Sequence, residues 1–411
     1  MQKESIINNR KLYKSNRLME ILRCSDQELS RFDLKKISGY SMSSVLELSK
    51  EMINDGLIYE EECAESRVGR KPAWLRINPA GGFYVGLEFN AQYMNCVVMD
   101  LVGNILYKEV RVTGDGLNPY QVKLEDILGQ IRDMLGHALE HVPDRKKVIG
   151  IGLGIPGYVD SQKGISYGYS RIPAWKNIMI RDLIREETGI PCYIQNNVSV
   201  MTLAYKWLNY HGNSKDFVFI SIRTGIRMVT ISNNRLVLGK GGFAGELGHI
   251  RVSDSGRICT CGKYGCLNSE ISDPSVINII KEGFQVHHFQ KILEMVNGEE
   301  EKVSIEHYVQ AVREGDEDSV QLMKSVAKTL GKALALVVNI LAPAEMVLSG
   351  KQFAIGEIFL EEIRKVVKTD VIEENYKNLS IKKSEFGGEI GAIGAACMVM
   401  EEYFSYQDME V

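Results

Sequence analysis

The sequence predicts an N-terminal winged helix-turn-helix of α+β type, followed by a two-lobed α/β body. Three observations predict this order: short amphipathic helices around a glycine turn, alternating strands and helices from residue 82 onward, and a second hairpin start at residue 217. A chain of 411 residues has room for roughly two to four domains. We expect a DNA-binding domain at 1–78, a first lobe at 82–199 joined by helix 390–411, and a second lobe at 200–389 that holds the dimerisation helices.

The composition is that of an ordinary globular protein. Apolar residues make up 45% and charged residues 25%, and the net charge of −4 argues against a polybasic nucleic-acid coat or a membrane-surface protein. A small DNA-reading module is still allowed, because residues 1–78 hold 14 basic and 12 acidic residues against 35 and 41 in the remainder. The most apolar stretch, 333–344, is shorter than the roughly 20 residues of a membrane span, and the N-terminus lacks an apolar secretory core. We expect a cytoplasmic protein without a membrane partner.

A helix-turn-helix pattern occupies the first part of the chain. Apolar residues at helical spacing form three groups: Leu18, Ile21 and Leu22; Leu29, Leu34 and Ile37; Val45, Leu48 and Met52. Ser30 and Asp33 resemble a capping box at the start of the second helix, and Gly39 can take the positive φ of a tight turn before the third.

Two predicted strands follow the third helix and would form the wing. Asp55–Tyr59 reads as a turn into a strand, and Trp74–Ile77 as the returning strand. The stiff basic segment Gly69–Pro72 suits a DNA minor groove, although a solvated linker would look the same. Glutamates at 60–62 and 65 would repel phosphate, so we expect the wing tip to point away from DNA.

The outer side of the third helix carries candidate DNA contacts. Small hydroxyl side chains at its N-terminus can approach phosphates and base edges, and a glutamate can accept from the cytosine amino group. The alternative is the solvated face of a small helical domain. The candidate DNA-binding residues are Ser41, Ser43, Ser44, Glu47, Lys50, Arg70 and Lys71.

The remainder of the chain alternates strand and helix signals, and the pattern restarts halfway. The expected elements are strands at 83–87, 95–100 and 105–107, a helix at 124–139, a strand run within 148–157, and strands at 217–222 and 228–231. Because the second hairpin repeats the first, we expect two related lobes with a cleft between them.

One cluster of cysteine and histidine carries the most specific chemistry. His249, Cys259, Cys261 and Cys266 lie within eighteen positions, which matches the Cys₃His set of structural zinc, whereas the other five cysteines are scattered singly. A reactive or merely buried cysteine group is the alternative. Four protein ligands fill the shell, so we expect one structural zinc per chain that fixes the loop holding Glu246 and His249. Neighbouring glycines allow close approach by a ligand, although a flexible loop without a ligand would look the same.

Four motifs together resemble the ROK family of bacterial repressors, open reading frames and sugar kinases. They are Gly-Ile-Gly-Leu-Gly-Ile-Pro-Gly-Tyr-Val-Asp at 150–160, Ala-Gly-Glu-Leu-Gly-His at 244–249, Cys-x-Cys-Gly-x-x-Gly-Cys at 259–266, and Gly-Ala-Ile-Gly-Ala-Ala at 391–396. The N-terminal module ending in Gly69–Pro72 resembles the repressor branch of that family. The resemblance implies an actin-like ATPase fold of the sugar-kinase type, a sugar between the lobes, and homodimers or homotetramers.

The chain departs from the family's kinases at each place that handles phosphate. The first loop, Asp-x-Gly-Gly-Thr in the kinases, is Glu88–Gln92 here, and the second loop, Gly-Thr-Gly-x-Gly, is Arg223–Arg227. The side chains at both places block a close backbone cradle for phosphate. Asn196–Asn197 aligns with the Asn-Asp pair that holds the catalytic base, and an amide cannot take the sugar proton, a loss of typically ~10²–10⁴-fold. We therefore expect no enzymatic activity.

A sugar pocket could survive this loss of chemistry. The resemblance points to Asn196, Asn197, Glu246 and His249 as sugar-binding residues. The family's sugar-contacting glutamate after the last zinc cysteine is Asn268 here. Glu270, two positions on, could compensate for it, but we expect Glu270 to face elsewhere.

The leading hypothesis is a DNA-binding regulator, a repressor of carbohydrate-metabolism genes whose inactive kinase-like body senses a sugar or sugar derivative. Its partners would be a double-stranded DNA operator, the sugar and a second copy of the chain. One alternative is a ROK-type sugar kinase with an N-terminal extension. Another is a regulator whose body is a scaffold without a sugar effector.

Overall fold

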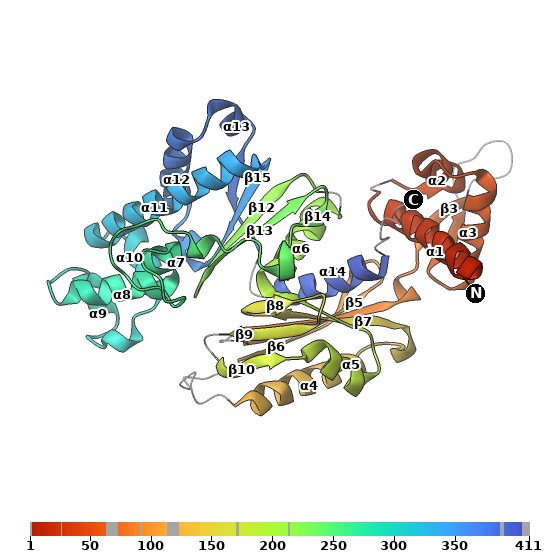
Figure 1. The fold of residues 1–411 in the computed structure, drawn as a ribbon, viewed down its shortest axis with the longest axis horizontal. Helices are drawn as coiled ribbons and strands as arrows, with labels where there is room; N and C mark the ends of the chain where they lie inside the picture. The colour runs from red at the N-terminus through yellow and green to blue at the C-terminus, as the bar shows by residue number, and fades with distance from the viewer. Residues whose placement is uncertain are drawn as a thin grey trace. The chain divides into compact units, whose positions relative to one another are not determined.

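The computed structural model describes residues 2–25, 27–62, 73–90, 93–112, 123–169, 172–212, 214–386 and 390–404. The chain divides into two units, coloured from red to blue along the sequence in Figure 1. Unit 1 combines Met1–Asn213 with Gly387–Val411, and unit 2 is Ser214–Phe386.

The N-terminal part of unit 1 contains three helices and a small sheet of order β1-β3-β2. Strands β2 and β3 pair antiparallel, with Ile58 opposite Ile77, which confirms the predicted hairpin. Arg70 and Lys71 lie outside the described residues. The elements are α1 (Gln2–Arg23), β1 (Leu29–Ser30), α2 (Arg31–Ser38), α3 (Met42–Asn54), β2 (Ile58–Glu62) and β3 (Ala73–Ile77).

The predicted capping box starts α2. The Asp33 backbone N–H donates to Ser30 Oγ at 3.3 Å, and the Ser30 backbone N–H donates to Asp33 Oδ2 at 2.9 Å. The turn after α2 is also confirmed, because Gly39 has a φ of 73°.

The prediction for the second apolar face is wrong in two of its three members. Leu34 is buried, but Leu29 lies on β1 opposite Leu75, and Ile37 is 52% exposed. For Leu29 the reason is that Ser30 caps the helix, so α2 begins only at Arg31 and Leu29 precedes it.

The first lobe belongs to unit 1 and is built on a five-stranded mixed sheet of order β11-β7-β4-β5-β6. Strand β5 pairs antiparallel with both β4 and β6, whereas β7 pairs parallel with both β4 and β11. A smaller sheet, β10-β9-β8, follows β7. The elements are β4 (Phe83–Phe89), β5 (Tyr93–Asp100), β6 (Ile105–Val112), α4 (Leu124–Glu140), β7 (Val148–Ile155), β8 (Tyr158–Asp160), β9 (Ile165–Tyr169), β10 (Ile172–Ile178), α5 (Ile180–Thr188), β11 (Cys192–Asn196), α6 (Asn197–Tyr210) and α14 (Ile390–Phe404).

Helix α14, far away in the sequence, packs on this sheet and on α6 (Figure 1). Glycines allow the close approach: a Cβ at Gly152 would lie 2.0 Å from the Ala395 carbonyl oxygen, and a Cβ at Gly394 would lie 1.7 Å from that of Val200. Because α6 packs on α14 and β7, the division between the units falls after residue 213 and not at the expected residue 200.

Arg23 at the end of α1 joins the N-terminal helices to α6 and α14. Its guanidinium lies over the ring of Phe404 at 4.4 Å and over that of Trp207 at 5.6 Å. It also donates to the Tyr84 hydroxyl at 3.5 Å. Beside it, Glu401 of α14 accepts from Lys206 and from the Trp207 indole of α6. The N-terminal module is therefore fastened to the same two helices that pack on the sheet.

Unit 2 has a second five-stranded sheet of order β14-β13-β12-β15-β16, with helices around it. Strand β12 pairs antiparallel with β13 and parallel with β15, as β4 does with β5 and β7. This repeated strand order confirms the expectation of two related lobes. The elements are β12 (Phe217–Ile222), β13 (Ile226–Ser232), β14 (Arg235–Leu236), α7 (Leu267–Ile271), α8 (Asp273–Phe284), α9 (Gln290–Met295), α10 (Ile305–Arg313), α11 (Glu317–Leu341), β15 (Glu345–Ser349), α12 (Glu357–Asp370), α13 (Glu373–Lys377) and β16 (Ser380–Lys383).

Among the helices that the structure describes, none combines the length and apolar character needed to span a membrane.

Candidate functional site

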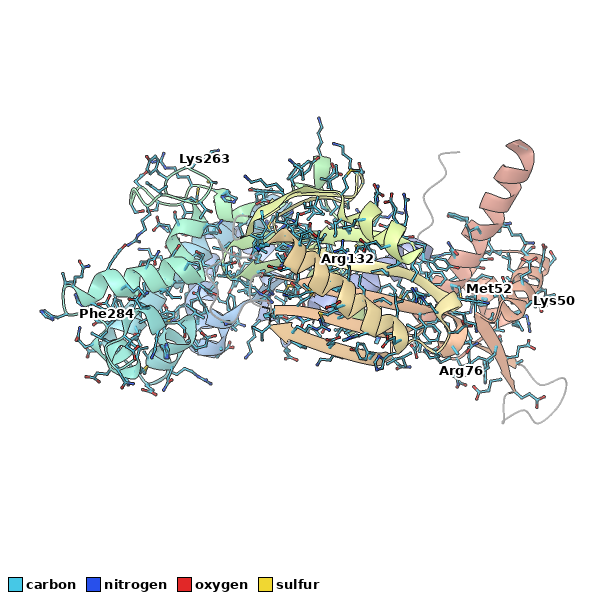
Figure 2. All side chains as sticks on the ribbon, turned by 90° about the horizontal axis from the view of Figure 1, so that it is seen from below. Lys50, Met52, Arg76, Arg132, Lys263 and Phe284 are labelled. Atoms are coloured by element: carbon cyan, nitrogen blue, oxygen red, sulfur yellow. The ribbon has the colours of Figure 1, made fainter. Side chains whose placement is uncertain are left out.

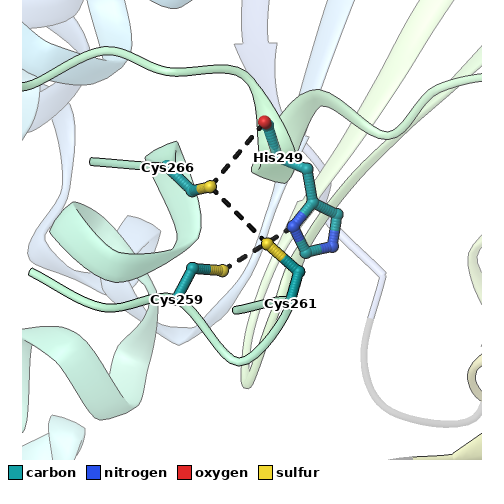
Figure 3. A group of neighbouring side chains, drawn as sticks. All are labelled: His249, Cys259, Cys261 and Cys266. Carbon is teal, nitrogen blue, oxygen red and sulfur yellow. Dashed lines mark hydrogen bonds between the residues drawn. The ribbon is translucent and has the colours of Figure 1, made fainter. Parts of the chain in front are cut away.

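The four predicted metal ligands meet in unit 2 (Figure 3). Their ligand atoms all lie within 4.8 Å of one another. Cys261 Sγ is 3.8 Å from Cys266 Sγ, and Cys259 Sγ is 3.7 Å from His249 Nδ1. Tetrahedral zinc with bonds of about 2.0–2.3 Å requires ligand-to-ligand distances of about 3.5–3.8 Å. The side chains therefore fit a tetrahedral ion, with His249 Nδ1 as the histidine ligand.

The loop between His249 and Cys266 is shaped by backbone contacts and contains little regular structure. Isolated antiparallel β-bridges pair the backbone of Arg251 with that of Cys266, and the backbone of Ile258 with that of Tyr264. Gly265 has a φ of 65°, and a Cβ there would lie 1.8 Å from the Ser253 carbonyl oxygen. Ile250 and Val252 at the start of the loop pack against the core, but Ile258 and Tyr264 are 70% and 58% exposed, so apolar burial contributes little to holding its outer part.

The thiols of the cluster differ in acidity. Burial, together with the neighbouring Cys261 and Cys259 sulfurs, raises the pKa of Cys266 to about 12. Burial also opposes ionisation of Cys261, but hydrogen bonds from the Lys263 backbone and the other two thiols outweigh it and lower the pKa of Cys261. A divalent cation at the centre would stabilise all three thiolates.

One ring nitrogen of His249, Nδ1, faces the cluster, and the other nitrogen, Nε2, faces Glu246. Its Nε2 lies 3.9 Å from Glu246 Oε2. The other carboxylate oxygen of Glu246 pairs with Arg227. The predicted sugar-binding residues Glu246 and His249 therefore lie together, beside the metal ligands. A carboxylate next to the outer nitrogen of a metal-bound histidine orients the ring and strengthens the ligand.

Asn268 and Glu270, which follow shortly after Cys266, make contacts within the protein. Asn268 Oδ1 accepts from the Ile226 backbone N–H at 2.6 Å, which ties α7 to the start of β13. Glu270 pairs with Arg257 and accepts from the Ser255 hydroxyl, as expected for a side chain that faces elsewhere.

The other two predicted sugar residues lie in unit 1, at the start of α6. Asn196 is 4% exposed, and its side chain accepts from the Val198 N–H and donates to the Gly157 carbonyl. It acts as the cap of α6. Asn197 is half-buried, and its amide donates to Glu88 Oε1 at 3.4 Å.

Glu88 is a residue whose position the sequence reasoning did not anticipate. It is 1% exposed, and its carboxylate accepts from Asn95 and Asn197. Its only signal in the sequence is its place in the altered first phosphate loop.

The described DNA-binding candidates lie on α3. Ser41 caps this helix by accepting from the Ser44 N–H at 3.2 Å, and its hydroxyl also contacts that of Ser43. Glu47 pairs with Lys11 of α1. Met52 is buried and Lys50 exposed, so α3 has one core face and one outer face (Figure 2).

Asp273 is a buried carboxylate at the start of α8. It accepts from the Gln352 amide at 2.9 Å, and burial raises its pKa to about 6. A pKa raised above the unfolded value means that the ionised form destabilises the fold above pH 6, and that this cost fades as the pH falls through 6 toward 4.

Asp273→Asn is therefore expected to stabilise unit 2. The gain in the free energy of unfolding should be up to about 3 kcal/mol at pH 8 and about half of that at pH 5. Urea unfolding at both pH values measures it. An equal change at both pH values would contradict the assignment.

Two lobes with the same strand order, one of them holding a Cys₃His cluster, define a protein with the actin-like ATPase fold of sugar kinases. The ROK family profile matches residues 84–402. The chain belongs to the ROK family.

Three comparisons describe its relatives. The xylose repressor of Caldicellulosiruptor bescii is 26% identical over 403 residues, covering 98% of this chain and 99% of that protein. The glucokinase of Thermotoga maritima is 26% identical over 317 residues, covering 77% of this chain and 97% of that enzyme. The crystal structure of a ROK family transcriptional regulator, a homologue of the Escherichia coli Mlc protein, superposes with a TM-score of 0.83 at 23% identity, covering 96% of this chain and 97% of that one. The last comparison shows the shared fold.

Proposed function

We propose that this protein is a sugar-responsive transcriptional repressor of carbohydrate-metabolism genes and has no kinase activity. The observation that carries the proposal is the N-terminal module: the similarity to the xylose repressor extends over it, whereas the glucokinase similarity covers 77% of the chain. Three helices with a glycine turn and a paired hairpin fit a winged helix-turn-helix, with the outer face of α3 in the major groove. As a homodimer or homotetramer it would read two half-sites of an operator.

The altered phosphate loops and the missing base support the non-enzymatic part. Asn197 carries an amide where phosphoryl transfer needs a carboxylate, and the nearby Glu88 is buried. In the second loop, Arg227 is held by Glu246. These features oppose the alternative of a sugar kinase with an N-terminal extension.

A sugar sensor with Asn197, Glu246 and His249 as ligands, and one structural zinc, completes the proposal. Helix α6 begins at Asn197 and ends at Tyr210. In its last turn, the Trp207 ring lies under the Arg23 guanidinium of α1. A displacement of α6 on sugar binding would therefore act on the N-terminal module. The opposing view, a scaffold without an effector, gives this connection no role.

Footprinting of the DNA upstream of its own gene tests the proposal. The wild-type protein should protect two half-sites, and one sugar among D-xylose, D-glucose and a wider panel should abolish the protection. Lys50→Ala should lower the affinity about three- to tenfold by removing a cation from the outer face of α3, whereas Lys324→Ala on α11 should leave it unchanged. No protected DNA would refute the regulator. If the protein protects DNA and no sugar changes that protection, the sugar-sensing part is refuted and the regulator with a scaffold body remains.

Phosphorylation of any sugar by the wild-type protein with ATP would revive the kinase alternative.

A further inference from the structure

Arg227 lies on β13, in the second altered loop, where the kinases of the family need glycine. Its side chain is 14% exposed and turns toward the loop before His249. The guanidinium pairs with Glu246 and donates to the carbonyl oxygens of Gly242 at 3.0 Å and Ala244 at 3.3 Å. One side chain thus makes three contacts to residues 242–246.

The backbone of this loop and the carboxylate of Glu246 are held in different ways. The loop backbone is attached to β13, since the Met228 N–H donates to the Gly245 carbonyl at 2.9 Å, and a Cβ at Gly245 would lie 1.8 Å from Met228 O. These contacts place the Glu246 backbone but leave its side-chain torsions open. The Arg227 guanidinium selects one orientation, in which the second carboxylate oxygen lies 3.9 Å from His249 Nε2.

We propose that Arg227 is a positioning residue for the effector, which holds the Glu246 carboxylate in place to accept hydrogen bonds from the hydroxyl groups of an uncharged sugar. This inference rests on the proposed sugar-sensing function. The guanidinium fork is suited to the role, because it can bind a carboxylate and neighbouring carbonyls at once, which the ammonium of lysine does less well. The residue that blocks the phosphate cradle thereby organises the ligand site.

Calorimetric titration of the full-length, zinc-loaded protein with D-xylose and D-glucose tests the inference. Arg227→Met should weaken binding of the sugar that the wild-type protein recognises by about 10–100-fold, the usual cost of losing a hydrogen bond to a charged group. Arg227→Lys should restore part of the affinity. The control Lys240→Met removes an exposed cation from the same loop and should leave the affinity unchanged.

A double-mutant cycle separates positioning from general stabilisation. If Arg227 acts through Glu246, Arg227→Met should cause no further loss of affinity in the Glu246→Gln background. Zinc content and melting temperature verify that each variant is folded, and Arg227→Lys carries the test if Arg227→Met does not fold.

The outcomes are distinguishable. Equal sugar affinity of the wild-type and Arg227→Met proteins, or additive losses with Glu246→Gln, would overturn the inference and leave the proposed function standing. A wild-type protein that binds neither these sugars nor others of the wider panel would refute sugar sensing itself, and the inference with it.

Discussion

Cys261→Ala is expected to weaken zinc binding by about a hundredfold or more and to release the loop between His249 and Cys266. If four ligands share the roughly 10–16 kcal/mol of a structural zinc site, one thiolate carries roughly 3 kcal/mol. Cys261 is the exposed member of the cluster, so the substitution removes a ligand with little loss of packing. Since Ile258 and Tyr264 are also exposed, apolar burial cannot hold the outer part of the loop in place of the ion.

Metal analysis and limited proteolysis measure these effects. The wild-type protein should hold about one zinc per chain and keep it against a chelator that strips the variant. Proteases should then cut the variant between residues 250 and 266. Asp254→Ala, an exposed substitution in the same loop, serves as the control. The sugar affinity should fall as well, because His249 loses the ion that orients its ring. A wild-type protein without zinc would contradict the metal assignment.

Gly394→Ala is expected to destabilise unit 1 by about 3 kcal/mol or more, although alanine is the better helix former. The added Cβ would lie 1.7 Å from the Val200 carbonyl oxygen, so α14 must move away from α6. Backbone atoms cannot rotate aside as a flexible side chain can, which is why the cost is large.

The same substitution at Gly129 provides the matched control. Gly129 lies within α4 of the same unit, and a Cβ there meets nothing within 4 Å. Gly129→Ala should therefore stabilise the protein by about 0.5–1 kcal/mol. Urea unfolding of both variants measures the change in the free energy of unfolding, which should be a loss for Gly394→Ala and a gain for Gly129→Ala. Destabilisation of similar size at both positions would show that the α14–α6 contact is not the cause.

Local signals in the sequence predicted local structure well. The Ser30–Asp33 cap, the turn at Gly39 and the hairpins depend on residues a few positions apart, and the structure confirms them. The cysteine cluster was equally visible, because its ligands are near neighbours in the chain. The failure at Leu29 has a local cause, since helical spacing was counted across Ser30, the residue that caps the helix.

Contacts between distant segments could not be predicted. The sequence marks Arg227 as an obstacle to phosphate and Glu246 as a sugar ligand, but their pairing depends on how the loop folds back on β13. The bond from Asn197 to Glu88 likewise joins residues 109 positions apart. Periodicity and spacing carry no information about such pairs, which arise only when the sheets are assembled.

The position of α14 has a consequence for the order in which the protein forms during translation. Unit 2 is one continuous segment, so all of it has been synthesised once residue 386 is added. Unit 1 begins much earlier, yet the face of β4 and β7 that receives α14 has no cover until residues 390–404 follow. Domains usually complete folding in the order of their synthesis. Here the part of the chain that is made first is the last to close its core, and a ribosome that stalls before residue 390 leaves that core open.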